Sequence, residues 1–305
     1  MCLSAISGAR KCVKAAESYR EEETDMKTKK KFPVFRIVNG LIFIILALII
    51  IIPMWKVLVD SFDLKTAYGM KMWPEKFGLD GYVSVFRNPT LFRPLVISFV
   101  TTILGTLLAL TLSTLGAYVL IQWEMPGRTF FANFLLFTMI FNGGMIPTYL
   151  VLSALHLTNT LLVVILFPAL NVYNLVLMRN FFEGIPQSLF ESATLDGCSP
   201  MQTFIRIVLP MSKAALASIG LMYAVTYWND YTHYKLYITD SKWYNFQMKL
   251  RSVIMGSDLP QSTGGATENT VKNAAIIVVI IPFMILYPFL QKYFVKGVNI
   301  GAVKE

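Results

Sequence analysis

Long apolar stretches alternate with short polar ones along most of the chain. Residues 37–55 contain no charged residue, and residues 41–52 are unbroken apolar sequence up to Pro53. About 20 mostly apolar residues are enough for a helix to cross the hydrocarbon core of a bilayer, so this stretch predicts a membrane span. It is too long for a signal-peptide core and no A-x-A pattern follows, so we expect it to be retained. The six predicted spans are residues 37–55, 95–121, 129–155, 157–178, 214–228 and 274–294.

The composition agrees with this pattern. The 305 residues are 55% hydrophobic and only 15% charged, with a mean hydropathy of +0.57. Ordinary soluble domains have about 25% charged residues, so a soluble globule is excluded, as are disorder and collagen. We therefore predict an all-α integral membrane protein with six transmembrane helices. Its parts are a basic arm (1–36), a membrane domain (37–295) and a short tail (296–305).

Positive charge indicates how the chain lies in the membrane. The net charge is +9, and nine of the 27 Lys and Arg residues fall in residues 1–36, which we predict to be disordered. With the N-terminus inside, the inner segments hold 16 Lys and Arg and the outer segments 11. We therefore expect both termini in the cytoplasm. Because the basic run begins just after Met26, we also expect translation to start there.

Two predicted spans are irregular, and a third carries a stripe of small residues. Residues 142–147 read Asn-Gly-Gly-Met-Ile-Pro, and the next span contains Pro168. Such backbone is tolerated at membrane depth where it is buried in protein or lines a watery cavity, and both alternatives stay open. The second span has small residues every four positions, which predicts a seam where another helix packs closely. The stripe is Thr101, Gly105, Ala109, Ser113 and Ala117.

Residues 184–213, between the fourth and fifth predicted spans, carry clear local signals. Pro186 suits the first position of a helix, and Gly197 can adopt the left-handed conformation that ends one. The segment lacks the Lys-rich amphipathic pattern that membrane surfaces attract. We therefore favour a docking element for a partner protein over a helix lying on lipid.

A second helix is predicted to start directly after Gly197. Ser199 is expected to be its N-cap and Gln202 its partner in a capping box, with Pro200 between them. Leu209 and Pro210 are expected to end it before the fifth span. The predicted unit is a helix, a glycine elbow and another helix.

The pattern Glu191-Ser192-Ala193, three residues, Gly197, nine residues, Ile207, one residue, Leu209-Pro210 resembles the EAA loop of membrane subunits of binding-protein-dependent ABC importers. Ser192 stands where that family usually has Ala. Residues 228–230 (Trp-Asn-Asp) and the tail 297–304 resemble its carbohydrate branch, the maltose-type permeases. Within that branch the tail is most similar to permeases for complex oligosaccharides in Gram-positive bacteria. The resemblance covers about residues 32–305.

The resemblance implies a type I ABC importer permease in a bacterial plasma membrane. The chain would form half of the pore beside a second, homologous permease. Two ATPase subunits would bind ATP and Mg²⁺, so no cofactor or metal is expected on this chain, and an extracellular lipoprotein would deliver the oligosaccharide. The residues implied to couple to the ATPase are Glu191, Ser192, Ala193, Asp196, Gly197, Ile207, Leu209 and Pro210.

Sugar contacts are predicted from amides and aromatic rings near the irregular spans, because sugars offer hydroxyls and apolar faces. Aromatic residues at span ends are more often interfacial belts, so packing remains the alternative. The candidate pore residues are Asn142, Tyr149, Asn171, Asn174, Tyr227 and Asn229.

Two other function classes remain as alternatives. An ion-driven secondary sugar transporter would need ionisable residues in mid-span, and the predicted spans are nearly free of them. A membrane enzyme acting on sugars or lipids would need a cluster of acids or metal ligands, and no D-x-D, H-E-x-x-H or G-x-S-x-G pattern is present. The phosphate-loop pattern G-x-x-x-x-G-K-[ST] is also missing, so no catalytic residue is predicted and ATP hydrolysis is assigned to a separate subunit.

Overall fold

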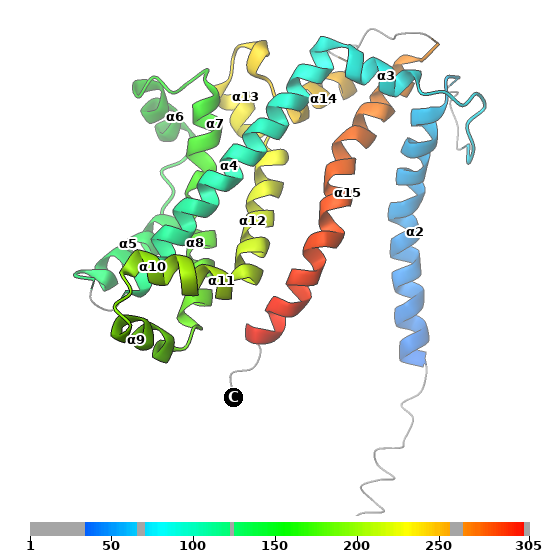
Figure 1. Cartoon of the computed structure of the whole chain (residues 1–305). Helices are drawn as coiled ribbons and strands as arrows, with labels where there is room; N and C mark the ends of the chain where they lie inside the picture. Colours follow the sequence, from blue (N-terminus) through cyan, green and yellow to red (C-terminus); the bar gives the residue numbers. More distant parts are fainter. Residues whose placement is uncertain (1–33, 66–70, 123–124, 257–264, 302–305) are drawn as a thin grey trace, which may run out of the picture. The chain divides into compact units, whose positions relative to one another are not determined.

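The computed structural model describes residues 34–65, 71–122, 125–256 and 265–301 (Figure 1). The predicted arm falls almost wholly outside these residues, as does the expected start at Met26. The described chain divides into two compact units, residues 1–56 and 57–305. Its described residues are helical, without a strand, and contain one isolated antiparallel bridge between Asp63 and Phe77.

All six predicted spans fall on helices. The first lies in α2 (Val34–Phe62), the second in α4 (Pro89–Ile121) and the last in α15 (Glu268–Gly301). α2 and α4 are each long and apolar enough to cross a membrane, and up to five spans result if each bent helix pair counts as one. α15 continues through residues 296–301, which were expected to form the tail.

The remaining predicted spans are bent or short. The third bends by 115° between its two helices, at residues 141–144, where two glycines interrupt the apolar sequence. The fourth bends by 44° after Pro168. The elements are α5 (Arg128–Ile140) with α6 (Met145–Ala154), α7 (Leu161–Leu166) with the 3₁₀ turn η1 (Phe167–Ala169) and α8 (Val172–Glu183), and α12 (Lys213–Trp228).

Short helices fill the segments between spans. On the predicted outer side they are α3 (Asp80–Arg87), α13 (Thr232–Tyr237), η3 (Ser241–Trp243) and α14 (Phe246–Ile254). The segment 184–213 contains α9 (Gln187–Leu195), α10 (Pro200–Thr203), the π-helical turn η2 (Phe204–Val208) and α11 (Leu209–Met211).

α4 packs along α12 and α8 through its small-residue stripe (Figure 1). All five residues of the stripe are buried, which confirms the predicted seam. Tyrosines of α12 and α13 lie across it. A Cβ at Gly105 would be only 2.4 Å from the ring of Tyr227, and Ser113 Oγ lies 2.6 Å from the hydroxyl of Tyr223. The hydroxyl of Tyr234 donates to Thr101 Oγ1 at 3.0 Å.

Asp63, just after α2, is a buried carboxylate that organises the segment between α2 and α3. Its two oxygens accept three backbone N–H groups, from Lys65 (3.0 Å), Glu75 (3.1 Å) and Lys76 (3.2 Å). Burial alone would raise the pKa of this carboxyl. The three N–H donors and the charge of Lys71 outweigh burial, so the pKa of Asp63 lies below its ordinary value.

Gly105→Ala should destabilise the protein, because the added methyl group meets the ring of Tyr227 at 2.4 Å. Overpacking of this kind costs about 1–3 kcal/mol. The matched control is Gly220→Ala on α12, whose Cβ would make an ordinary 3.6 Å contact with Leu110. We expect a lower thermal unfolding midpoint in detergent for the first variant, and an unchanged or slightly higher midpoint for the control. Equal midpoints for the two variants would contradict the close seam.

Asp63→Asn should destabilise the protein in a pH-dependent way, because an amide keeps only one acceptor oxygen and turns an NH₂ group toward an N–H donor. A lowered native pKa stabilises the fold above the ordinary carboxyl pKa of about 4, and this contribution is lost as the pH falls through the native pKa. We expect a loss of about 1–3 kcal/mol at pH 7 that shrinks below about pH 4. The measurement is the unfolding midpoint against pH, with the exposed Glu191→Gln as control; a pH-independent difference would refute the assignment.

Candidate functional site

The predicted glycine elbow is present between α9 and α10. Gly197 has φ of +73°. The N–H of Cys198 donates to the carbonyl of Ala193 at 2.9 Å, and that of Gly197 donates to Thr194 at 3.0 Å. These two bonds together form a Schellman motif, which ends a helix and satisfies its last carbonyls. The elbow therefore has one defined backbone geometry.

The second helix starts at once, through the predicted capping box. Ser199 Oγ accepts the N–H of Gln202 at 3.3 Å, and the Gln202 side chain accepts the N–H of Ser199 at 2.9 Å. The first helix begins one residue later than expected, with Pro186 at its N-cap.

The second helix ends one residue beyond the predicted Leu209 and Pro210, before the fifth span. The helix continues to Met211, breaks at Ser212, and then bends by 82° into α12. Pro210 lacks an N–H, and its ring would clash with a carbonyl one regular turn earlier. The wider π turn η2 lies directly before it, where the N–H of Leu209 donates to the carbonyl of Phe204. That turn lets the helix pass through the proline.

The elbow presents a mixed surface of acidic and apolar side chains. Leu195 at its tip is 89% exposed, with Met201 and Ile205 also exposed nearby. Ala193 is buried beneath the elbow. The other residues of the implied coupling set divide by position: Glu191, Ser192, Asp196, Gly197 and Pro210 are exposed, and Ile207 and Leu209 are partly buried.

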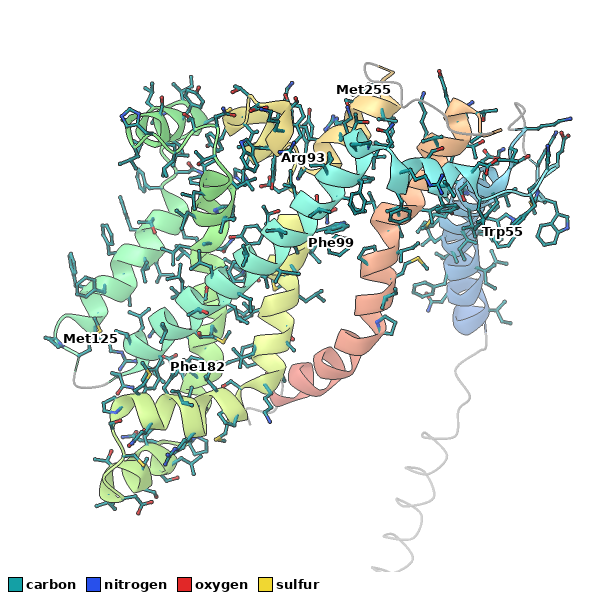
Figure 2. The ribbon with its side chains drawn as sticks, turned by 45° about the horizontal axis from the view of Figure 1, so that its top comes forward. Trp55, Arg93, Phe99, Met125, Phe182 and Met255 are labelled. Atoms are coloured by element: carbon teal, nitrogen blue, oxygen red, sulfur yellow. The ribbon has the colours of Figure 1, made fainter. Side chains whose placement is uncertain are left out.

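Two buried side chains attach the elbow to the membrane helices. Phe204 and Val208 of η2 pack in one cluster with Met178 and Phe182 of α8. Phe182 is labelled in Figure 2. The hydroxyl of Tyr118, near the end of α4, donates to the carbonyl of Pro200 at 2.8 Å, and its ring centroid lies 4.9 Å from that of Phe204. Sequence reasoning missed Tyr118, although it directly follows the last residue of the small-residue stripe.

Glu183, at the end of α8, is a second attachment that the sequence did not reveal. Its Oε1 accepts from Arg179 Nη2 at 2.8 Å and from Arg128 Nη2, at the start of α5, at 3.3 Å. These side chains are partly exposed, so each pair contributes little free energy alone. Their effect is to hold the ends of α5 and α8 together just before the elbow begins.

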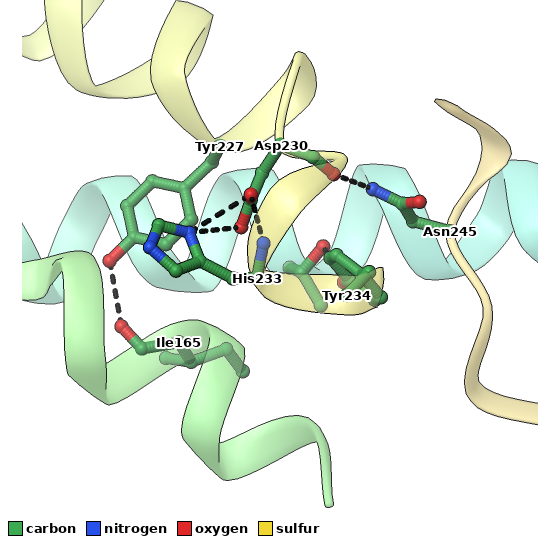
Figure 3. Close-up of polar contacts among 7 residues, drawn as sticks. Ile165, Tyr227, Asp230, His233, Tyr234 and Asn245 are labelled. Carbon is green, nitrogen blue, oxygen red and sulfur yellow. Dashed lines mark hydrogen bonds and ion pairs between the residues drawn. The ribbon is translucent and has the colours of Figure 1, made fainter. Parts of the chain in front are cut away.

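At the other end of α12, a cluster of hydrogen bonds fixes α13 and the start of α14 (Figure 3). The buried carboxylate of Asp230 accepts the N–H of His233 at 3.1 Å and lies 2.9 Å from that residue's Nδ1. Asn245, the N-cap of α14, donates its amide to the carbonyl of Asp230. The hydroxyl of Tyr227 donates to the carbonyl of Ile165 on α7 at 2.7 Å.

The candidate pore residues lie on several elements, from the α5–α6 break to the end of α12. Asn171 caps α8 by accepting the N–H of Asn174 at 3.2 Å, and this is the only bond described between two of the six. Asn142 accepts the N–H of Gly144 at the α5–α6 break, and Asn229 accepts from Gln247. Tyr227 and Asn174 are buried, whereas Asn142, Tyr149, Asn171 and Asn229 are exposed. Among the described residues, no three His, Cys, Asp or Glu side chains are grouped to hold a metal ion.

Residues 129–300 match the family model described as "Binding-protein-dependent transport system inner membrane component". Protein LplC of Bacillus subtilis is 40% identical over 92% of this chain and 98% of its own length. The polygalacturonan/rhamnogalacturonan transport system permease protein YtcP of the same organism is also 40% identical, over 85% of this chain and 94% of its own length. The chain is also similar to a chain in the crystal structure of a bacterial ABC transporter involved in the import of the acidic polysaccharide alginate. That similarity has a TM-score of 0.81 and 29% identity, and it covers 87% of this chain and 98% of the other.

Tyr118→Phe should loosen the elbow, because it removes the hydroxyl that bonds Pro200 while keeping the ring packed on Phe204. A lost hydrogen bond of about 1 kcal/mol corresponds to about fivefold faster amide exchange in α10. Tyr149→Phe is the matched control, since no described bond involves the exposed Tyr149 hydroxyl. Hydrogen exchange with mass spectrometry measures both variants, and unchanged protection of α10 in the first would show that Tyr118 does not hold the elbow.

Proposed function

The chain belongs to the family of binding-protein-dependent transport system inner membrane components, and from this membership we propose that it carries an oligosaccharide through a pore of which it forms one half. It is a permease subunit of an ABC importer, with a helical membrane-spanning fold of the type I importer kind. The predicted all-α membrane fold of the type I importer kind is thus confirmed, and the number of six spans stays a prediction. The cytoplasmic position of both termini stays a prediction.

The proposed substrate class rests on what relatives are named for. One relative is named for polygalacturonan and rhamnogalacturonan and another for arabinooligosaccharides, and the similar crystal structure belongs to an alginate importer. All of these are carbohydrates of several units. Within the pore, the exposed amides at the two helix breaks, Asn142 and Asn171, are suited to bond sugar hydroxyls, and the exposed ring of Tyr149 is suited to contact a sugar face.

The proposed complex contains a second, homologous permease, two ATPase subunits and an extracellular lipoprotein that binds the solute. In this proposal ATP and Mg²⁺ bind to the ATPase subunits and this chain catalyses no reaction. Its setting is the plasma membrane of a Gram-positive bacterium, as in the Bacillus relatives.

The observation that carries the coupling proposal is the fixed, protruding elbow. A Schellman motif and a capping box hold its backbone, and Leu195 projects from its tip between the acids Glu191 and Asp196. We assign Glu191, Ser192, Ala193, Asp196 and Gly197 to a knob that fits a groove of the ATPase. Ile207, Leu209 and Pro210 would join that knob to α12.

In this mechanism the ATPase pair closes on ATP and moves the knob with it. The attached helices then switch the pore from an inward-facing to an outward-facing state. A ligand shifts such an equilibrium only by its different affinity for the two states. ATP and the loaded binding protein would both favour the outward-facing state, so each should strengthen the binding of the other.

Gly197→Val should uncouple the transporter. Its Cβ would meet no atom within 4 Å, so the substitution acts only by straining the left-handed backbone, which costs roughly 1–2 kcal/mol. Glu191→Lys should have the same effect by reversing a charge on the knob. We expect the stimulation of ATP hydrolysis by loaded binding protein to fall at least about fivefold in both, which corresponds to about 1 kcal/mol.

Ser192→Ala is the matched control, because Ala is the usual residue at this position in the family and the expected stimulation is that of the wild type. Assembly is checked by co-purification of the ATPase subunit from membranes. Wild-type stimulation in both Gly197→Val and Glu191→Lys would refute the coupling role. An ion-driven transporter or a membrane enzyme requires no ATPase, so failure of the wild-type chain to co-purify with one would favour those alternatives.

A further inference from the structure

The chain folds back on itself directly after α2. The N–H of Leu64 donates to the carbonyl of Lys76, and that of Gly78 donates to the carbonyl of Phe62, each at 2.9 Å. The ring of Phe77 stacks on the ring of Phe62, with centroids 5.3 Å apart and planes within 13°. Phe62 is the last residue of α2, so Phe77 lies at the depth where this membrane helix ends.

The returning limb of this fold-back, residues 71–79, carries large apolar side chains on its surface. Met72 is 72% exposed, Trp73 74% and Phe77 67%, and Leu79 is also exposed. Soluble surfaces rarely concentrate such residues in so short a segment. Exposed Lys76 lies among them, between Trp73 and Phe77, and exposed Lys65 lies on the other limb.

Polar contacts fasten this segment to neighbouring helices. The Asp63 carboxylate accepts the N–H groups of Glu75 and Lys76 from the returning limb, which holds the two limbs together. The hydroxyl of Thr270, near the start of α15, donates to the Asp63 carbonyl at 2.6 Å, and Ser61 Oγ lies 2.7 Å from the hydroxyl of Tyr82 on α3. The backbone that carries the exposed apolar residues is therefore held in place by these hydrogen bonds.

We propose that residues 71–79 form an anchor in the outer leaflet of the membrane, with Met72, Trp73, Phe77 and Leu79 inserted at the level of the lipid headgroups. These residues pair with the end of a membrane span, so they lie at the depth of the membrane surface. Their side chains also suit that surface. Tryptophan is enriched where hydrocarbon meets water, and lysines beside apolar residues reach lipid phosphates from that depth.

An anchor at this position fixes the depth of two helix termini and of the helix α3. The end of α2, the helix α3 and the start of α15 are tied through Asp63, Ser61 and Thr270, and the anchor attaches that group to the lipid surface. Gly81 of α3 adds to the tie, since a Cβ there would be 3.0 Å from the Thr270 side chain.

The test is quenching of Trp73 fluorescence by lipid. The assembled transporter is reconstituted into vesicles of phosphatidylcholine and phosphatidylglycerol, with the phosphatidylcholine brominated either near the headgroup or near the chain end. The Trp73 signal is the difference between wild type and Trp73→Phe, which conserves an aromatic ring on the surface and leaves the core untouched. We expect about twofold quenching of this difference signal by the shallow bromines and much weaker quenching by the deep ones.

A second measurement tests the position of the anchor without relying on Trp73. Cysteine substitutions at Met72 and Leu79, each labelled with an environment-sensitive dye, should show blue-shifted emission in the vesicles, whereas a dye at the exposed Glu75 should shift less. If aqueous acrylamide quenches the Trp73 fluorescence and bromolipid does not, the proposal is wrong. The proposal is also wrong if the Trp73 emission changes when binding protein is added but not with bromolipid. That result would identify a protein-docking face instead.

Discussion

The close approach of α4 and the tyrosine face of α12 is the contact on which the rest of the second unit depends. Inside a bilayer, lipid tails are as apolar as leucine, so helices gain little by hiding apolar surface from each other. Association then relies on close van der Waals packing and on hydrogen bonds. Gly105 admits the ring of Tyr227, and Ser113 meets the hydroxyl of Tyr223, so a single seam provides both. Further tyrosine hydroxyls reach backbone carbonyls at helix ends: that of Tyr227 reaches Ile165 in the last turn of α7, where carbonyls lack regular partners.

The same seam connects the two polar clusters at the ends of α12. Toward the elbow, α4 ends near Tyr118, which holds Pro200. Toward the other end, Thr101 accepts from Tyr234, and Ser98 accepts the N–H of Phe246 at the start of α14. One helix thus contacts both the elbow and the Asp230 cluster. Each contact is a modest hydrogen bond, but together they fix the position of α4 along its axis relative to α10, α13 and α14.

Local rules allowed the sequence to predict the spans, the seam and the elbow. Gly197, Ser199 and Gln202 act within a few residues of one another, so their geometry follows from residue type and spacing. The contacts that fasten the elbow join residues far apart in sequence, such as Tyr118 to Pro200 and Arg128 to Glu183, and no local pattern marks them. The π turn before Pro210 was not predicted for a related reason, because it packs against α8, which lies far from it in the sequence. The helix break near Asn142 was visible in the sequence, whereas its 115° angle was not.

The close packing of α4 against α12 also determines which helices would move together with the elbow. α12 is joined to the elbow through α10, η2 and α11, spans 16 residues or about 24 Å, and ends at the Asp230 cluster. Because a Cβ cannot be added at Gly105 without meeting Tyr227, α4 and α12 have no free space in which to slide past each other. Densely packed elements transmit displacement instead of absorbing it, so these two helices should move as one body. Displacement that enters α12 across the 82° bend at Ser212 would then be carried along both helices to the Asp230 cluster. The bent pairs α5–α6 and α7–α8, whose breaks carry the exposed Asn142 and Asn171, are where the backbone has room to change angle. The proposed pore amides therefore lie where the two states of the pore should differ most, which is where contacts able to favour one state over the other would have to be made.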